Sequence, residues 1–231
     1  MKTKHDRING GMKICLACAA LLVSCTNPHR YVIEGQLDGI EGAVYLLDRE
    51  YAPVDSANAS AGRFRLAGEV AVPTIGHLNC EQEDLDIFFF LEPGTITISR
   101  SGEELPVAAG TPANDAYARY FGCLTELLEE LNAPETSDER RNALNEEITR
   151  LRVDTYYANV GNVFGALLLQ SPMCFRLSGR ELLDELAKFP AALQQSELLT
   201  VVRTYAERKL AAEEREQAAG AATPDSGTLA E

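Results

Sequence analysis

The strongest constraint on the fold is a change in the spacing of apolar residues at about Pro112. Before this proline, short runs rich in β-branched and aromatic residues alternate with turn residues, which is typical of short strands. After it, apolar residues recur every three to four positions, which is typical of amphipathic helices. The sequence therefore predicts an α+β fold in which a β domain is followed by a helical segment.

The β domain is predicted over residues 31–112. Turn residues at Asp38-Gly39, Ala61-Gly62 and Pro93-Gly94 separate its strands at hairpin-like spacing. Short, evenly spaced strands favour an antiparallel β-sandwich-like domain or an open barrel of about six to eight strands. The predicted strands are Tyr31–Gly35, Ala43–Leu47, Arg63–Leu66, Ile75–Leu78, Ile87–Leu91 and Thr95–Ile98.

The helical region is predicted over residues 113–216, and residues 217–231, which lack apolar periodicity, are expected to be a disordered tail. Two capping boxes, Thr136 with Glu139 and Ser178 with Glu181, predict helix starts. The remaining helices are expected from the apolar stripe that ends before Pro134, over Asn162–Leu169, and over Ser196–Glu216.

Residues 1–24 have the layout of a signal peptide, with basic residues followed by a short apolar run. The run is shorter than the roughly 20 residues that a spanning helix needs. Leu22-Val23-Ser24-Cys25 resembles the lipobox of bacterial lipoprotein precursors, which predicts lipidation of Cys25 and a short tether over residues 25–30. An ordinary signal peptide, cut after a small residue, is the alternative, and Met12 is an alternative start.

Lipid on Cys25 would attach the protein to a membrane, because two or more acyl chains anchor a protein stably. Thr26 follows the cysteine where some lipoproteins carry aspartate, which favours the outer membrane and a periplasm-facing position. Cys15 and Cys18 form a C-x-x-C pattern inside the apolar run. With no second ligand pair nearby, we interpret them as part of the signal and not as a metal or redox pair.

Charge excludes one class of partner. The chain carries a formal net charge of −14, whereas nucleic-acid binding depends on lysine and arginine neutralising phosphates. Nucleic acid is therefore not expected as a partner.

No catalytic, cofactor or metal site is predicted. His77 and Cys80 are three apart, so on a strand they would point to opposite faces, one to the core and one to the surface. The acidic cluster Glu81, Glu83, Asp84 and Asp86 lacks the glycine and register of a calcium loop, which favours a solvated hairpin connection.

Three other features have both a functional and a structural interpretation. Asp55-Ser56 lacks a nearby histidine or a G-x-S-x-G motif, which favours a strand edge over a nucleophilic site. The Phe88–Leu91 run could line a ligand groove, although apolar strands are more often buried under a covering layer. Tyr156-Tyr157 is either a contact surface or packing at a helix end.

The sequence also resembles a known family. The segments YVIEGQLDGIEGAVYLL, PVDSANASAGRFRLAGEVAVP, FFFLEPGTITI and VAAGTPAND are similar to domain of unknown function 4369, the N-terminal β domain of lipoproteins in the Bacteroides group. In such relatives a helical segment follows, and often a thioredoxin-like domain that exchanges disulfides. This sequence contains no W-C-x-x-C motif, so that chemistry is not carried over.

Together these patterns predict a lipoprotein of the cell envelope that acts as a non-catalytic binding or interaction module. The alternative is an accessory or shortened member of a thiol-disulfide exchange system, working with a separate thioredoxin-like protein. Cys80, Cys123 and Cys174 are the thiols available to it, and sequence leaves open which of them, if any, form a pair.

Overall fold

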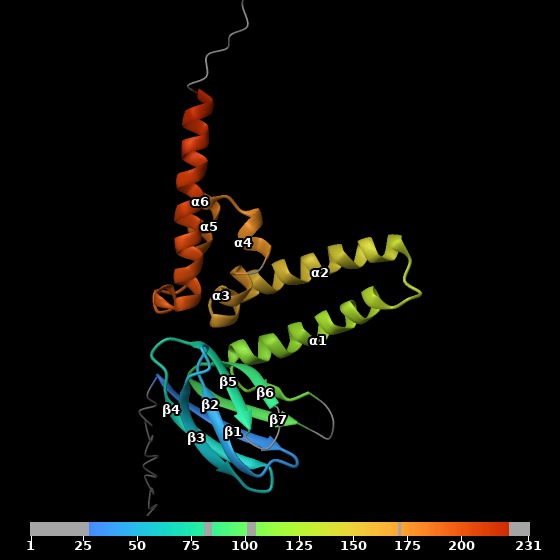
Figure 1. Ribbon diagram of the computed structural model, residues 1–231, viewed down its shortest axis with the longest axis vertical. Coiled ribbons are helices and arrows are strands. Elements are labelled where there is room, and N and C mark those ends of the chain that lie inside the picture. Colours follow the sequence, from blue (N-terminus) through green and yellow to red (C-terminus); the bar gives the residue numbers. More distant parts are fainter. Residues whose placement is uncertain (1–27, 81–84, 101–104, 171, 222–231) are drawn as a thin grey trace, which may run out of the picture.

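Residues 28–80, 85–100, 105–170 and 172–221 are described by a computed structural model. In these residues eight strands form two four-stranded sheets that face each other, and helices follow (Figure 1). The predicted α+β class, with a sandwich-like N-terminal domain, is confirmed. The strands are β1 (Arg30–Leu37), β2 (Gly42–Leu47), β3 (Pro53–Ala59), β4 (Arg63–Glu69), β5 (Thr74–Cys80), β6 (Leu85–Leu91), β7 (Gly94–Arg100) and β8 (Val107–Ala109).

One strand pair departs from the antiparallel prediction. Sheet A has the order β4-β1-β7-β8, and sheet B has the order β3-β2-β5-β6. In sheet A, β1 and β7 run parallel, with Tyr31 opposite Gly94 and Leu37 opposite Arg100. Parallel strands need a long connection, and here the chain builds all of sheet B and β4 between the two.

Two strands, β3 and β8, were not predicted from the spacing of apolar residues. Strand β3 forms an edge of sheet B and exposes most of its side chains. Strand β8 is three residues long and forms an edge of sheet A. Neither has enough buried residues to give an alternating signal.

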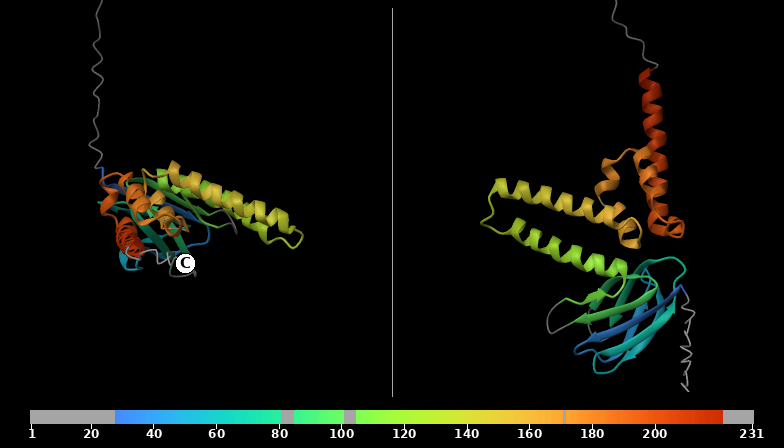
Figure 2. Two further views of the ribbon diagram at one scale, coloured as in Figure 1. Left: turned by 90° about the horizontal axis from the view of Figure 1, so that it is seen from above. Right: turned by 180° about the vertical axis from the view of Figure 1, so that it is seen from behind.

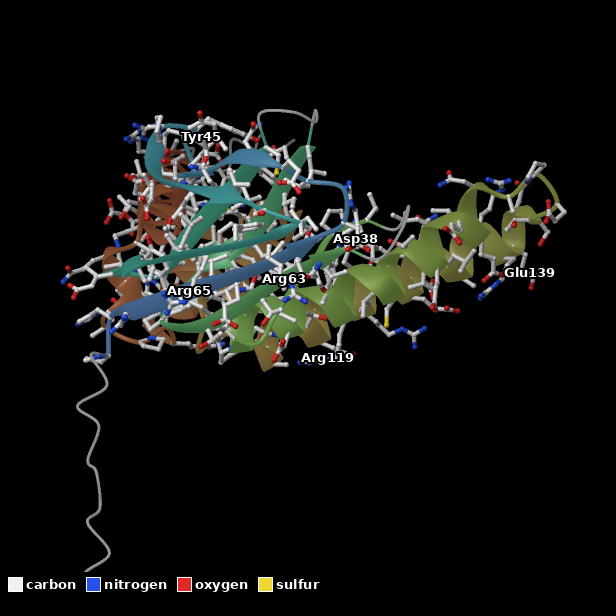
Figure 3. All side chains as sticks on the ribbon, turned by 90° about the horizontal axis from the view of Figure 1, so that it is seen from below. Asp38, Tyr45, Arg63, Arg65, Arg119 and Glu139 are labelled. Atoms are coloured by element: carbon white, nitrogen blue, oxygen red, sulfur yellow. The ribbon has the colours of Figure 1, made fainter. Side chains whose placement is uncertain are left out.

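The sandwich core lies between the sheets. The two-residue period of the strands sends Ile33, Leu46, Leu78, Phe89 and Ile96 into this layer, and none of them exposes surface. The outer face of sheet A is polar and exposed, as Arg63 and Arg65 of β4 show (Figure 3). One face of sheet A therefore contacts solvent, and the other face contacts the sandwich core.

The outer face of sheet B is apolar at Ile75, Phe88 and Phe90, and the helices pack there. Phe90 of β6 is fully buried there, with its ring centroid 5.7 Å from Tyr117 and 5.5 Å from Phe164. Ile75 of β5 belongs to the same cluster, which continues into the helical region. The molecule thus has two cores, one between the sheets and one between sheet B and the helices.

The helices are α1 (Pro112–Asn132), α2 (Asp138–Ala158), α3 (Val163–Leu169), α4 (Pro172–Arg176), α5 (Gly179–Ala187) and α6 (Glu197–Ala221), with a 3₁₀ turn over Leu193–Gln195. The α1–α2 hairpin extends beyond the sheets, with Glu139 near its far end (Figures 2 and 3). Helix α6 extends away from the sheets in another direction (Figure 1). No described helix has the length and apolarity that crossing a membrane requires.

The predicted helix starts agree with the structure except at α2, and α4 was not predicted. Ser178 and Glu181 form the predicted capping box of α5. At α2 the cap is Ser137, whose side chain accepts from the Arg140 N–H, and not Thr136. The Thr136 hydroxyl instead donates to the carbonyl of Glu130 at the end of α1. The last helix also continues to Ala221, beyond the expected end at Glu216.

Candidate functional site

His77 lies on the outer face of sheet B, and Cys80 lies in the sandwich core, so the two point to opposite faces as predicted. The expectation that one of them would be a surface residue is wrong, because both are buried. The ring of Tyr51, 4.3 Å from the imidazole, lies over His77 on the outer face.

His77 is part of a small polar cluster with Tyr51 and Asp86. The Asp86 carboxylate is 2.9 Å from His77 Nδ1 and accepts a hydrogen bond of 2.9 Å from the Tyr51 hydroxyl. That hydrogen bond is the main reason why the pKa of Tyr51 is raised. An aspartate can orient a histidine for base catalysis, but no hydrogen bond links this imidazole to a serine, threonine or cysteine hydroxyl or thiol among the described residues.

The other sequence candidates have structural surroundings. Asp55 and Ser56 lie on edge strand β3, where the Asp55 carboxylate accepts from the Ser56 N–H, so the strand-edge interpretation is confirmed. Glu81, Glu83 and Asp84 lie outside the described residues, as does Cys25. Within the described residues no group of three or more histidine, cysteine or acidic residues is placed to hold a metal ion.

The apolar run of β6 divides between the two cores. Phe89 and Leu91 face the other sheet, while Phe90, with the partly buried Phe88, packs against the helical cluster. The ring centroid of Phe88 is 5.2 Å from that of Tyr117. The prediction that this strand is buried under a covering layer is therefore confirmed, and helices form that layer.

The start of α1 is joined to β6 by buried polar groups that sequence reasoning did not identify. The amide of Asn114, which exposes no surface, accepts from the N–H of Phe90 at 2.9 Å and donates to its carbonyl at 2.8 Å. The same amide donates to the Thr111 hydroxyl at 2.8 Å. Asn114 thus pairs with strand β6 as a neighbouring strand would, and we call this contact the Asn114 joint.

Glu92 holds the other side of this helix start. Its carboxylate accepts from the N–H of Ala113 at 2.8 Å and is only 6% exposed. Burial raises the pKa of Glu92, and hydrogen bonds from Thr111, Ala113 and Asn114 offset part of that rise. A carboxylate at this position also satisfies an N–H group that the first turn of a helix cannot pair.

A second buried carboxylate, Glu185 of α5, lies at the C-terminal end of α2. It accepts from the Tyr156 hydroxyl at 2.9 Å and from Lys188 Nζ at 2.7 Å. Burial, followed by the bond to Glu185, raises the pKa of Tyr156. Tyr156 is fully buried, so it serves as packing, whereas Tyr157 is 51% exposed and carries the Lys188 ammonium 5.3 Å from its ring centre.

The Tyr157 ring lines a groove between α2 and the segment of α4, which we call the arginine groove. Its narrow part encloses about 220 Å³, and a wider part of about 540 Å³ continues from it past Thr149 and Arg176. The narrow part is lined by Thr149, Arg152, Val153, Tyr157, Met173, Arg176 and Leu177, and the wider part by Asn145, Glu146, Thr149, Arg150 and Arg176.

The arginine groove combines apolar walls with unpaired cations. No hydrogen bond or ion pair to another described residue involves the guanidinium of Arg150, Arg152 or Arg176. The single acidic residue that lines it is Glu146. In a chain with an excess of acidic residues, this cationic groove is the most distinctive surface for ligand binding among the described residues.

The three described cysteines differ in how accessible their thiols are to solvent. Cys174 is buried, and burial raises the pKa of its thiol, which lowers its reactivity. Cys80 lies in the sandwich core. Cys123 of α1 is exposed and lines a second groove, against α2, together with Arg119 and Tyr120. Among the described cysteines, only Cys123 is accessible to a partner's thiol.

Comparison with known proteins places the β domain in a family. No curated protein matches the chain. Residues 31–117 match the model of a domain of unknown function, DUF4369. The matched segment covers the described strands and the first turns of α1, so it includes the Asn114 joint. Residues 31–117 therefore form a domain of the DUF4369 family.

Proposed function

We propose that this protein is a lipid-anchored, non-catalytic binding module of the cell envelope, and that the arginine groove is its binding site. The observation that carries the binding role is the group of three arginines, unpaired among the described residues, around an apolar groove. The guanidinium groups of Arg150 and Arg176 are exposed and that of Arg152 is half-buried, so all three can pair with an anion whose apolar part packs against the walls of the groove.

The anchor rests on the sequence Leu22-Val23-Ser24-Cys25 at the end of a short apolar run. Acyl chains on Cys25 would hold the protein at a membrane surface, and we propose the periplasmic side of the outer membrane. Pro28, three residues after this cysteine, is the first residue that the structure describes, and β1 begins at Arg30, so the tether would keep the sandwich close to the membrane.

The anchor is tested by labelling cells with radioactive palmitate. The wild-type chain should incorporate label and Cys25→Ala should not, while Cys18→Ala, a matched change inside the apolar run, should be labelled normally. Label that persists in Cys25→Ala would contradict lipidation at this residue.

The binding role is tested by native mass spectrometry of the chain purified from its own host. The wild-type protein should retain a small molecule of constant mass, unchanged on incubation, and Arg176→Glu should lose it. Arg215→Glu, at an exposed position of α6 outside the groove, serves as the matched control. A wild-type chain that carries no bound molecule would contradict the proposed function.

A role as an accessory in thiol-disulfide exchange is the second candidate, and the exposure of Cys123 favours it. An alkylation assay distinguishes it: a mixed disulfide between Cys123 and a thioredoxin-like protein, absent in Cys123→Ser, would support exchange. If Cys123 stays in the thiol form in cells, this second candidate fails.

A further inference from the structure

Helix geometry gives the arginine groove two unlike ends. Successive residues of an α-helix are turned by about 100°, so Arg150 and Arg152 fall on opposite sides of the line from Thr149 to Val153. Arg176, across the groove on α4, lines both the narrow and the wide part. Arg152 and Arg176 therefore line the narrow part together, whereas Arg150 lines only the wide part.

Apart from Thr149, Arg152 and Arg176, the residues that line the narrow part are apolar or aromatic. Val153, Met173 and Leu177 form its walls, and the ring of Tyr157 stands at the same end. Tyr157 is held in place, because Lys188 lies over its ring and is itself bonded to Glu185 at 2.7 Å. The apolar end is thus a narrow slot with one firmly supported aromatic wall.

The volumes favour a small ligand with a head and a tail. The apolar part, about 220 Å³, is below the roughly 300–1,000 Å³ of pockets for drug-sized molecules, and it suits one flexible chain. The wider part, about 540 Å³, leaves room for a solvated headgroup. Both walls are helical, so a peptide would find no strand edge to pair with, and the slot is too short for an apolar helix face.

We propose that the arginine groove binds a single-chain alkyl anion, with its carboxylate or phosphate between Arg152 and Arg176 and its chain toward Val153 and Leu177. This inference rests on the proposed binding role and names the ligand class of that site. Guanidinium pairs with carboxylate and phosphate through two parallel hydrogen bonds, which gives the headgroup a defined place. Glu146, at the wide end, opposes the anion and limits its affinity.

Binding is measured by isothermal titration calorimetry on residues 26–231, which include every residue of the described fold. Laurate and dodecyl phosphate, below their micelle concentrations, should each bind with one molecule per chain. Inorganic phosphate, which lacks the chain, should bind at least about tenfold more weakly. Dodecyltrimethylammonium, which has the same chain and the opposite charge, should not bind.

Single-residue variants test where the headgroup and the alkyl chain of the ligand bind. Arg176→Gln should weaken laurate binding by about tenfold or more, because it removes a charge-assisted pair. Val153→Asp should abolish binding, and Glu146→Gln should tighten it. Arg215→Gln, a matched change on α6, should bind as the wild type does. Equal affinity of Arg176→Gln and wild type, or equal binding of the anion and the cation, would overturn the inference.

Vesicles of phosphatidylglycerol identify the source of the alkyl anion. Sedimentation of the unlipidated chain with these vesicles, lost in Arg176→Gln, would make it a membrane lipid; binding of soluble laurate without sedimentation would make it a free amphiphile. If neither laurate, dodecyl phosphate nor vesicles bind while the purified chain retains another molecule, the alkyl-anion inference fails and the binding role stands. If the purified chain retains nothing either, both fail.

Discussion

At the scale of single residues, Asn114 determines how the helices attach to the β domain. Its buried amide satisfies both backbone groups of Phe90 and the hydroxyl of Thr111. A buried amide is costly unless each of its groups is bonded, and here the partners are supplied by another element of the fold. The sequence A-G-T-P-A-N-D is thus a structural motif that starts α1 and attaches it to β6.

Asn114→Ala should lower the free energy of unfolding by about 2–4 kcal/mol, because it leaves the N–H and carbonyl of Phe90 buried without partners. Urea denaturation measures the change. Asn132→Ala is the matched control, since that amide bonds to a carbonyl at the exposed end of α1, and it should cost less than about 0.5 kcal/mol. Similar losses in both variants would contradict the role of the joint.

Glu92 predicts a pH dependence of stability. Its folded pKa is raised above the ordinary value of 4.5, so the folded state holds this proton more firmly than the unfolded state does. The stability that this group contributes is therefore fully present below pH 4.5 and is lost as pH rises through the raised folded pKa. Glu92→Gln keeps an acceptor for the Ala113 N–H and removes the titration.

The stability of wild type relative to Glu92→Gln should therefore fall as the pH rises above 4.5. Urea unfolding at several pH values measures this difference, and Glu126→Gln, at an exposed position of α1, controls for the change in net charge. A difference that stays constant, or that rises with pH, would show that the pKa of Glu92 is not raised.

At the scale of elements, the turn between α1 and α2 depends on Arg141. Its guanidinium donates to three carbonyls at the end of α1 and in the turn, those of Leu131, Ala133 and Thr136, at 2.8–3.0 Å. These carbonyls lack helical partners and lie at the negative end of the helix dipole. The neighbouring Arg140 instead forms exposed ion pairs with Glu130 and Glu147.

Arg141→Gln should lower the free energy of unfolding by about 1–3 kcal/mol and speed hydrogen exchange of the amides in the turn, because it removes the cationic donor from the carbonyls of Leu131 and Thr136, while the Ala133 carbonyl keeps the Thr136 N–H. Arg140→Gln should have a smaller effect that fades with added salt, as exposed ion pairs are screened. The reverse order of the two losses would contradict this account of the turn.

The elements also show where sequence patterns are informative. Six strands and five helices can be predicted from the period of apolar residues, from turn residues or from capping residues. Strand β3 does not, because it exposes most of its side chains, and β8 is too short to show a period. The parallel pairing of β1 with β7 depends on contacts between residues far apart in sequence, and no local pattern encodes it.

The arginine groove was not predicted for the same reason. Arg150 and Arg152 look like ordinary exposed residues of a charged helix, and Arg176 lies in a short helix that the sequence does not signal. Only the packing of the α4 segment against α2 brings the three together. A useful sequence signal would have been Val153 and Tyr157, which place apolar side chains one turn apart beside those arginines.

At the scale of the whole molecule, strand β6 couples the sandwich to the helices. Phe89 and Phe90 are adjacent and fully buried, but Phe89 belongs to the sandwich core and Phe90 to the helical core. The two cores therefore share one strand and the Asn114 joint. This arrangement predicts that the helical region depends on the sandwich for its attachment.

Phe90→Ala should separate the unfolding of the two parts, with helical circular dichroism lost at a lower urea concentration than the protection of sandwich amides from exchange. Removing this ring costs about 3–5 kcal/mol, nearly all of it in the helical core. Phe89→Ala, the matched change one residue away, should instead destabilise the sandwich and lower both transitions together. A single transition in Phe90→Ala would contradict the division into two cores.

The central claim is that the arginine groove holds a ligand, and a crystal structure of the chain purified from its own membranes tests this most directly. We predict elongated electron density that starts between Arg152 and Arg176 and ends beside Tyr157, and its absence from crystals of Arg176→Glu. A groove that contains only ordered water in the wild-type protein, with its arginines turned to solvent, would contradict the claim.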